Sequence, residues 1–289
     1  MNLILIHGRD QQGQDPSMLK KLWIDTLKKG FGLADLQIPE NVNVVFPFYG
    51  DLLDGLIKEV TDPTELAGVI AKGDIPEKEL IYFYEFITEL ADNAGLTLED
   101  INVNYHEDHR EKGALNWAWV QAILQTLDSC DRIGKFTLQK FTYDVFIYLT
   151  NAAIKRRIND FILTAFDDEP CVVVGHSLGS VVGYNVLQAN SNLKVNKYIT
   201  IGSPLGVKAV KSRLTTPLSM PLCVKNGWYN AYDERDYVAL NSLDKHNFNI
   251  EPSILNSNHV KNATNNRHGI EGYLNDAKVA KAIYDAMVD

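Results

Sequence analysis

Apolar and polar positions follow two different periods along the chain, and these periods predict strands and helices. Apolar or β-branched runs without helical spacing predict buried strands at residues 3–7, 42–48, 171–174, 197–201 and 248–254. Apolar residues at helical spacing predict three helices in these parts of the chain. The first begins at Asp15-Pro16 and ends at Gly30 and Gly32, the second spans 178–188, and the last spans 276–287. Because strands alternate with helices, the pattern predicts an α/β fold with a mainly parallel sheet.

The middle of the chain breaks this alternation, because residues 51–160 contain little that has the pattern of a strand. Asp62-Pro63 and Ile75-Pro76 are predicted helix starts, and an apolar stripe follows at Leu80, Phe83, Tyr84 and Ile87. Further helices are predicted at 117–127, 141–149 and 156–166, with a charged loop at 104–112. The pattern therefore predicts a body formed by residues 1–50 and 161–289, interrupted by a helical insertion at 51–160.

The net charge of −9 is concentrated in this insertion. The chain has 37 acidic and 28 basic residues, of which residues 51–160 hold 20 and 11. The rest of the chain holds 17 of each and is neutral. An acidic chain excludes nucleic acid as the expected partner, since that affinity depends on Lys and Arg. An acidic insertion also disfavours contact with anionic lipid.

Cysteine use and the N-terminus bear on the expected compartment. The chain has an odd number of cysteines, which are Cys130, Cys171 and Cys223. The last two lie in apolar runs, which predicts buried free thiols. The N-terminal apolar run is short and has no basic residues before it, unlike a signal peptide. No apolar run approaches the roughly 20 residues of a membrane span. We expect a cytoplasmic protein without stable membrane insertion.

The most specific motif is Gly175-His176-Ser177-Leu178-Gly179, which has the form G-x-S-x-G. It lies between a predicted strand and a predicted helix, as a nucleophile elbow requires. Outside 51–160 the chain resembles the α/β-hydrolase superfamily. The resemblance depends on this elbow, on Ile6-His7-Gly8 at the end of the first strand, and on the acid and histidine described next. It is greatest to lipase- and esterase-like members with a helical lid, here residues 51–160.

The resemblance implies a catalytic serine, acid and histidine in that chain order. Ser177 would be the nucleophile, and Asp236 would be the acid, with Asp233 as the alternative. His268, in a polar loop before the last helix, would be the base, with His259 as the alternative. His246 is more typical of a structural residue, and His176 is expected to pack beside the nucleophile.

The resemblance also implies an oxyanion hole, with one N–H from Leu178 and another from Gly8 or Arg9. The side chain of Arg9 would either bind an anionic substrate group or be a solvated loop arginine. No cofactor is implied. The cluster His106-Glu107-Asp108-His109 is more typical of a charged surface loop than of a metal site.

Aromatic residues are frequent in the lid. They are Trp117, Trp119, Phe83, Tyr84, Phe86, Phe141, Tyr143, Phe146 and Tyr148. Most are expected to form the core of the lid, and one face would border a substrate pocket.

The expected function is hydrolysis of a small-molecule or lipid-like carboxylic ester. Two alternatives stay open: a thioesterase, amidase or acyltransferase with the same triad, and a non-catalytic protein that binds a ligand or partner.

Overall fold

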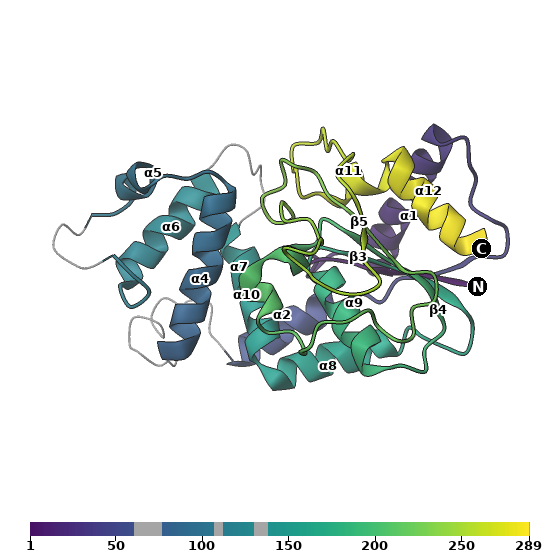
Figure 1. Cartoon of the computed structure of the whole chain (residues 1–289), viewed down its shortest axis with the longest axis horizontal. Coiled ribbons are helices and arrows are strands. Elements are labelled where there is room, and N and C mark those ends of the chain that lie inside the picture. Colours follow the sequence, from purple (N-terminus) through teal and green to yellow (C-terminus); the bar gives the residue numbers. More distant parts are fainter. Residues whose placement is uncertain (61–76, 107–111, 130–137, 289) are drawn as a thin grey trace.

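A computed structural model describes residues 1–60, 77–106, 112–129 and 138–288 of the chain (Figure 1). In this part of the chain, one six-stranded sheet has the order β2-β1-β3-β4-β5-β6, and every pair of neighbouring strands is parallel. The strands are β1 Asn2–Ile6, β2 Asn43–Val45, β3 Cys171–His176, β4 Val195–Ile201, β5 Trp228–Ala231 and β6 Leu255–Ser257. The sheet and its flanking helices confirm the predicted α/β class.

Helices cover both faces of the sheet because side chains alternate along each strand. Leu3 and Leu5 of β1 belong to a core on one face, while Ile4 and Ile6 belong to the core on the other. The first face is covered by α1 Pro16–Leu33, α11 Ile270–Leu274 and α12 Ala277–Val288. The second face is covered by α2 Gly50–Val60, α8 Ala152–Leu163 and α9 Leu178–Ala189, and two short helices, η1 Pro204–Gly206 and α10 Lys208–Lys211, follow β4.

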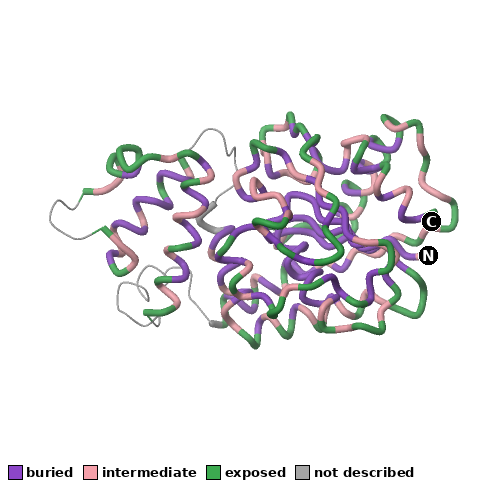
Figure 2. Tube along the Cα trace, viewed as in Figure 1, coloured by how far each residue is buried: buried purple, intermediate pink, exposed green. Residues whose placement is uncertain are grey.

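Four helices project beyond the sheet and form what we call the helical group: α4 Glu77–Asn93, α5 Leu98–Val103, α6 Trp117–Ser129 and α7 Leu138–Thr150 (Figure 1). Their inward positions are buried (Figure 2) and continue the core of the second sheet face. Glu89 of α4 fixes the group to the body, since its carboxylate accepts the N–H groups of Lys208 at 2.9 Å and Ala209 at 3.3 Å. The neighbouring helices α2 and α8, also between β2 and β3, pack with the body.

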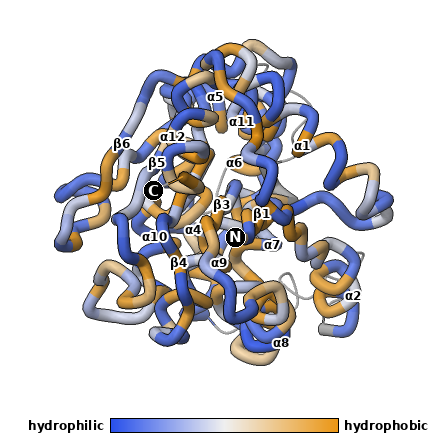
Figure 3. The backbone as a smooth tube through the Cα atoms, turned by 90° about the vertical axis from the view of Figure 1, so that its right-hand side faces the viewer, coloured by the Kyte–Doolittle hydropathy of each residue, from blue (hydrophilic) through white to orange (hydrophobic). Residues whose placement is uncertain are grey.

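Several predicted elements agree with the structure. Asp15 caps α1 by accepting the N–H of Met18 at 2.8 Å, and Pro16 is the first helical residue. In Figure 3 hydrophobic residues gather around the central strands and polar residues occupy the outer loops, as the alternating pattern predicts. None of the described helices combines the length and apolar character needed to cross a membrane.

Other predicted elements were wrong. The helix α1 does not end at Gly30 and Gly32 but continues to Leu33. Gly30 is a packing position within it, since a Cβ there would lie 2.4 Å from the carbonyl oxygen of Leu274. The second strand is shorter than 42–48. Residues 248–254 form no strand, although Phe248, Ile250 and Ile254 are buried, because they fill the core as an irregular segment and the strand follows at β6.

The apolar stripe predicted on α4 is also displaced. Tyr82 and Phe86 are buried beside Phe83, whereas Leu80 and Tyr84 are half-buried. The helix starts predicted at Asp62-Pro63 and Ile75-Pro76 lie outside the described residues.

Candidate active site

Ser177 lies at the turn where β3 ends and α9 begins. Its backbone has φ 54° and ψ −130°, which an L-residue rarely adopts and which stores local strain. The flanking glycines are required by close approach, since a Cβ on Gly179 would lie 2.3 Å from the carbonyl oxygen of Ile6 and one on Gly175 would lie 2.7 Å from the Cα of Ser180. The turn therefore has the tight geometry that the G-x-S-x-G motif predicts.

His268 and Asp236 meet Ser177 in one buried chain of hydrogen bonds. The Nε2 atom of His268 lies 2.7 Å from Ser177 Oγ, and its Nδ1 atom lies 2.7 Å from Asp236 Oδ2. All three residues are less than 5% exposed. Because Nδ1 faces a carboxylate, it carries the ring proton, so that Nε2 accepts from the serine hydroxyl. The structure thus brings together the three side chains singled out in the sequence.

Asp233 and His259, the alternative acid and base, lie in other surroundings. The carboxylate of Asp233 accepts the N–H of Asn262 at 2.6 Å and the guanidinium of Arg235 at 2.8 Å. Burial alone would raise the pKa of Asp233, but its hydrogen bonds with Arg235 and Asn262 together lower that pKa below its usual value. His259 is exposed, as is His246. Asp233 therefore organises the loop and does not orient the imidazole of His268.

Asn262 holds the loop that carries His268, and the sequence reasoning missed it. Its buried side-chain amide donates to the carbonyl oxygens of Asn266, Arg267 and Gly269 at 2.9–3.0 Å. A Cβ on Gly272 would lie 2.0 Å from the Asn262 side chain, so this glycine makes room for it. An asparagine in a polar loop carries no sequence signal of such a role, because its acceptors are defined only by the folded loop.

Tyr273 is a second residue that the sequence reasoning did not assign. Its hydroxyl donates to Asp236 Oδ2 at 2.6 Å and accepts the N–H of Asp233 at 3.3 Å. Burial raises the pKa of Tyr273 well above its usual value, and the nearby Asp236 charge acts in the same direction. The phenol stays protonated and supports the orientation of the Asp236 carboxylate.

His176 packs beside the nucleophile, as predicted, and holds the backbone of His268. Its Nε2 atom donates to the carbonyl oxygen of His268 at 2.9 Å. Burial lowers the pKa of His176 well below its usual value, so its ring is neutral.

The loop after β1 approaches Ser177 closely at Gly8. A Cβ at Gly8 would lie 2.8 Å from Ser177 Cβ, so only glycine fits there. The imidazole of His7 accepts the N–H of Tyr49 at Nε2 and therefore donates from Nδ1 to the carbonyl oxygen of Gly8, at 2.6 Å. Because a trans peptide directs its N–H opposite to its C=O, this bond orients the N–H of Arg9 away from the His7 ring.

The side chain of Arg9 is buried, which corrects the expectation of a solvated arginine. Its Nε atom lies 2.8 Å from Asp144 Oδ2 of α7, and its Nη2 atom lies 3.1 Å from Asp10 Oδ1. Its side chain is 1% exposed and is paired with these two carboxylates of the same chain.

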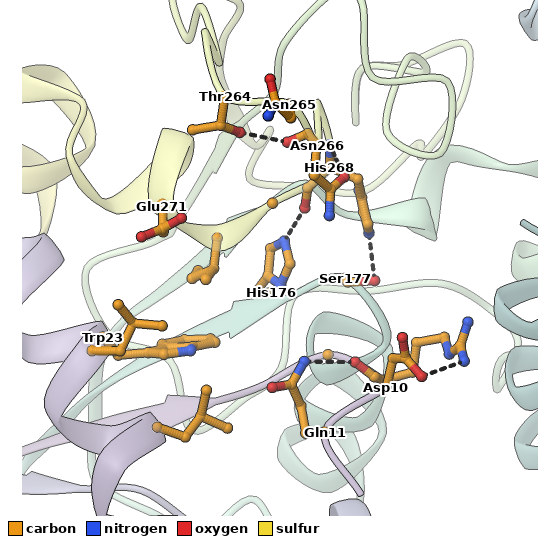
Figure 4. A pocket seen from close by; sticks show the side chains of 16 residues that line it. Asp10, Gln11, Trp23, His176, Ser177, Thr264, Asn265, Asn266, His268 and Glu271 are labelled. Atoms are coloured by element: carbon orange, nitrogen blue, oxygen red, sulfur yellow. Dashed lines mark hydrogen bonds and ion pairs between the residues drawn. The ribbon is translucent and has the colours of Figure 1, made fainter. Parts of the chain in front are cut away.

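A cavity of about 610 Å³ opens beside Ser177 and His268 (Figure 4). Its walls come from the β1–α1 loop, α1, and the loop that leads into α11. The lining residues are Gly8, Arg9, Asp10, Gln11, Leu19, Leu22, Trp23, His176, Ser177, Thr264, Asn265, Asn266, His268, Gly269, Ile270 and Glu271. The described aromatic residues of the helical group are absent from this lining.

Those aromatic residues instead form the core of the helical group and its contact with the body. Trp119, Phe83, Phe86, Phe141, Phe146 and Tyr148 are buried, while Trp117, Tyr84 and Tyr143 are half-buried. Phe141 reaches the site itself, since its ring meets that of His268 edge-on with centroids 5.8 Å apart. The group therefore supports the His268 side of the site from behind the cavity.

Among the described residues, no cluster of three His, Cys, Asp or Glu side chains could hold a metal ion. Of the sequence His106-Glu107-Asp108-His109, the last three residues lie outside the described part. No protein-family model, curated protein or solved structure matches this chain.

Proposed function

We propose that this protein is a serine hydrolase of the α/β-hydrolase type that cleaves carboxylic esters. The observation that carries the proposal is the buried hydrogen-bond chain from Ser177 through His268 to Asp236, with the serine on a strained strand-to-helix turn. A serine hydroxyl needs such a base, oriented by a carboxylate, to become a nucleophile.

In the proposed reaction, Ser177 Oγ attacks the ester carbonyl while its proton passes to His268 Nε2. Asp236 stabilises the imidazolium that forms, and the hydroxyl of Tyr273 orients Asp236. The imidazolium then protonates the departing alcohol oxygen, which leaves an acyl group on Ser177. Water, deprotonated by His268, attacks the acyl carbon, and the proton returns to Ser177 as the acid departs.

We assign the oxyanion to the N–H groups of Leu178 and Arg9. Leu178 is the first residue of α9, so its N–H has no acceptor within the helix and lies at the positive end of the helix dipole. The hydrogen bond from His7 to the Gly8 carbonyl fixes the peptide between Gly8 and Arg9, whose N–H we take as the second donor.

The position of the site in the sheet supports the proposed fold type. Ligands of open parallel sheets bind at the carboxyl ends of strands where the strand order reverses. Here the chain runs from β1 outward to β2 and then back to β3 on the other side of β1. Gly8 follows β1 and Ser177 follows β3, so both lie at that reversal. We further propose that the protein is cytoplasmic, which the two free, buried thiols of Cys171 and Cys223 support.

A fluorophosphonate probe tests the nucleophile. We expect it to label the folded wild-type protein and Ser191→Ala, whose serine is exposed in the turn after α9, but not Ser177→Ala. Hydrolysis of p-nitrophenyl esters of graded chain length should show the same dependence. His268→Ala should abolish turnover while His259→Ala retains it. Unlabelled wild-type protein, or equal labelling of Ser177→Ala, would contradict the proposal.

A further inference from the structure

The cavity beside Ser177 has an unbalanced set of charged side chains. Apart from its histidines, the charged groups that the described part of the chain contributes to its lining are Arg9, Asp10 and Glu271. The single cation among them, Arg9, is 1% exposed and lies between Asp10 and Asp144. A ligand in the cavity therefore meets two carboxylates and a guanidinium that is already surrounded by carboxylates.

Glu271 is the charge with the greatest freedom to act on a ligand. It lies in the first turn of α11, it is exposed, and within the described part of the chain its carboxylate has no hydrogen bond or ion pair. Figure 4 places it on the side of the cavity opposite Asp10, with His176 between the two. A substrate bound in the cavity therefore lies beside negative groups on two of its sides.

The rest of the wall nearest to Glu271 is apolar. Leu19, Leu22 and Trp23 of α1 line the cavity together with Ile270, the residue before Glu271. Ligand sites of this size combine such an apolar surface with a few polar groups that determine orientation. The cavity thus offers an apolar surface for one part of an ester and a negative field for any charge on the substrate.

We propose that the substrate is an ester with an apolar part and without negative charge, and that positive charge on it is favoured, with Glu271 as a specificity-determining residue. This inference rests on the proposed function. It excludes esters that carry a carboxylate or phosphate, because the described lining has no exposed cation to neutralise them. Desolvating an unpaired anion beside carboxylates is unfavourable.

Three butyrate esters of similar size test the inference. Butyrylcholine is cationic, 3,3-dimethylbutyl butyrate is its neutral isostere, and 4-(butyryloxy)butanoate is anionic. For a partly solvated charge we expect kcat/KM to fall about threefold from the cation to the neutral ester and about threefold again to the anion. The difference should lie mainly in KM, since the charge acts on bound substrate and transition state alike.

Glu271→Gln should reduce the ratio of kcat/KM for the cationic ester to kcat/KM for the anionic ester from about tenfold to about threefold. For the wild-type protein, 0.5 M salt should reduce this ratio by the same amount. The matched control is Glu169→Gln, which should leave the ratio unchanged. Glu169 is exposed and lies just before β3, at the end of the sheet opposite Ser177. Equal kcat/KM for the three esters, or a ratio unaffected by Glu271→Gln, would overturn the inference alone. Absence of Ser177-dependent turnover of the neutral ester would overturn the proposed function and the inference with it.

Discussion

Asp233 and Asp236 show how the environment of a residue separates two identical side chains. They are three positions apart and both are about 2% exposed. The Asp233 carboxylate is directed to Arg235 and to the N–H of Asn262, whereas Asp236 Oδ2 accepts from His268 and Tyr273. From these partners we assign loop organisation to the first carboxylate and orientation of the base to the second.

Substitution with asparagine should separate the two roles. Asp236→Asn should lower kcat for ester hydrolysis by about 10⁴-fold, as loss of the orienting carboxylate does in serine hydrolases, with little change in stability. Asp233→Asn should instead lower the free energy of unfolding by about 2 kcal/mol, because it weakens buried charged hydrogen bonds, and leave most of kcat in the folded fraction. Steady-state kinetics and urea denaturation check both. A kcat lost in Asp233→Asn and kept in Asp236→Asn would reverse the assignment.

His7 is a residue whose burial makes stability depend on pH. Burial lowers its pKa from the usual 6.5 to about 4, against the opposing effect of its hydrogen bond with Gly8. Because the folded pKa lies below the unfolded one, the unfolded chain binds the proton first as the pH falls. The neutral ring therefore contributes its full stability above about pH 6.5, and this contribution decreases as the pH falls toward about 4.

We expect the free energy of unfolding to decrease by about 2 kcal/mol because of His7 when the pH falls from 7 to 5. His176, whose pKa burial also lowers, acts in the same direction. In urea denaturation over this pH interval, the free energy of unfolding of His7→Gln should decrease by about 2 kcal/mol less than that of the wild type. His259→Gln, at an exposed position, should show the same decrease as the wild type. NMR titration of wild-type protein gives a second test, since a His7 ring that protonates near pH 6.5 would contradict the prediction.

At the scale of elements, the helical group contacts the site through α7. Asp144 of α7 pairs with Arg9 of the β1–α1 loop, and Phe141, one turn earlier, contacts His268. Both Arg9 and Asp144 are buried. The helical group therefore holds the loop that we assign to the oxyanion hole, and Asp144 is a positioning residue.

A double-mutant cycle on Arg9 and Asp144 tests this contact. Asp144→Asn should destabilise the protein by about 3 kcal/mol, because it leaves the buried Arg9 charge undercompensated. It should lower kcat more than it raises KM, since the oxyanion donor is used in the transition state. Adding Arg9→Met should recover part of the stability and give a coupling of at least about 1.5 kcal/mol.

The control for this cycle is Asp285→Asn on α12, which breaks the exposed Lys281–Asp285 pair and should cost less than about 0.5 kcal/mol. Additive effects of the Arg9 and Asp144 substitutions on both stability and kcat would show that α7 does not position the loop.

At the scale of the molecule, the parallel sheet assembles the site from distant segments. Ser177 and His268 are 91 positions apart, and the loops after β1, β3, β5 and β6 supply Gly8, Ser177, Asp236 and His268. Parallel strands direct all these loops to one edge of the sheet. The acidic segment 51–160 lies between β2 and β3, and its described residues supply none of the lining of the cavity. The acidic side chains described in this segment therefore lie outside the wall of the cavity.

The sequence by itself determined the features that depend on local chemistry. The alternation of apolar and amphipathic segments is sufficient for the α/β class, because strands and helices bury their apolar faces with different periods. The glycines around Ser177 indicate a tight turn, because only glycine allows such close backbone approach. Chain order and the superfamily resemblance then reduced the acid and the base to two candidates each.

Only the tertiary structure decided which candidates meet. Asp236 and Asp233, like His268 and His259, are equivalent in a linear pattern, whereas His268 meets Asp236 from 32 positions away and Ser177 from 91 positions away. Asn262 and Tyr273 gain their roles only from atoms that the fold brings within 3.3 Å. The buried pairing of Arg9 with Asp144 was equally hidden, because burial and the direction of a hydrogen bond depend on packing between elements rather than on the order of residues.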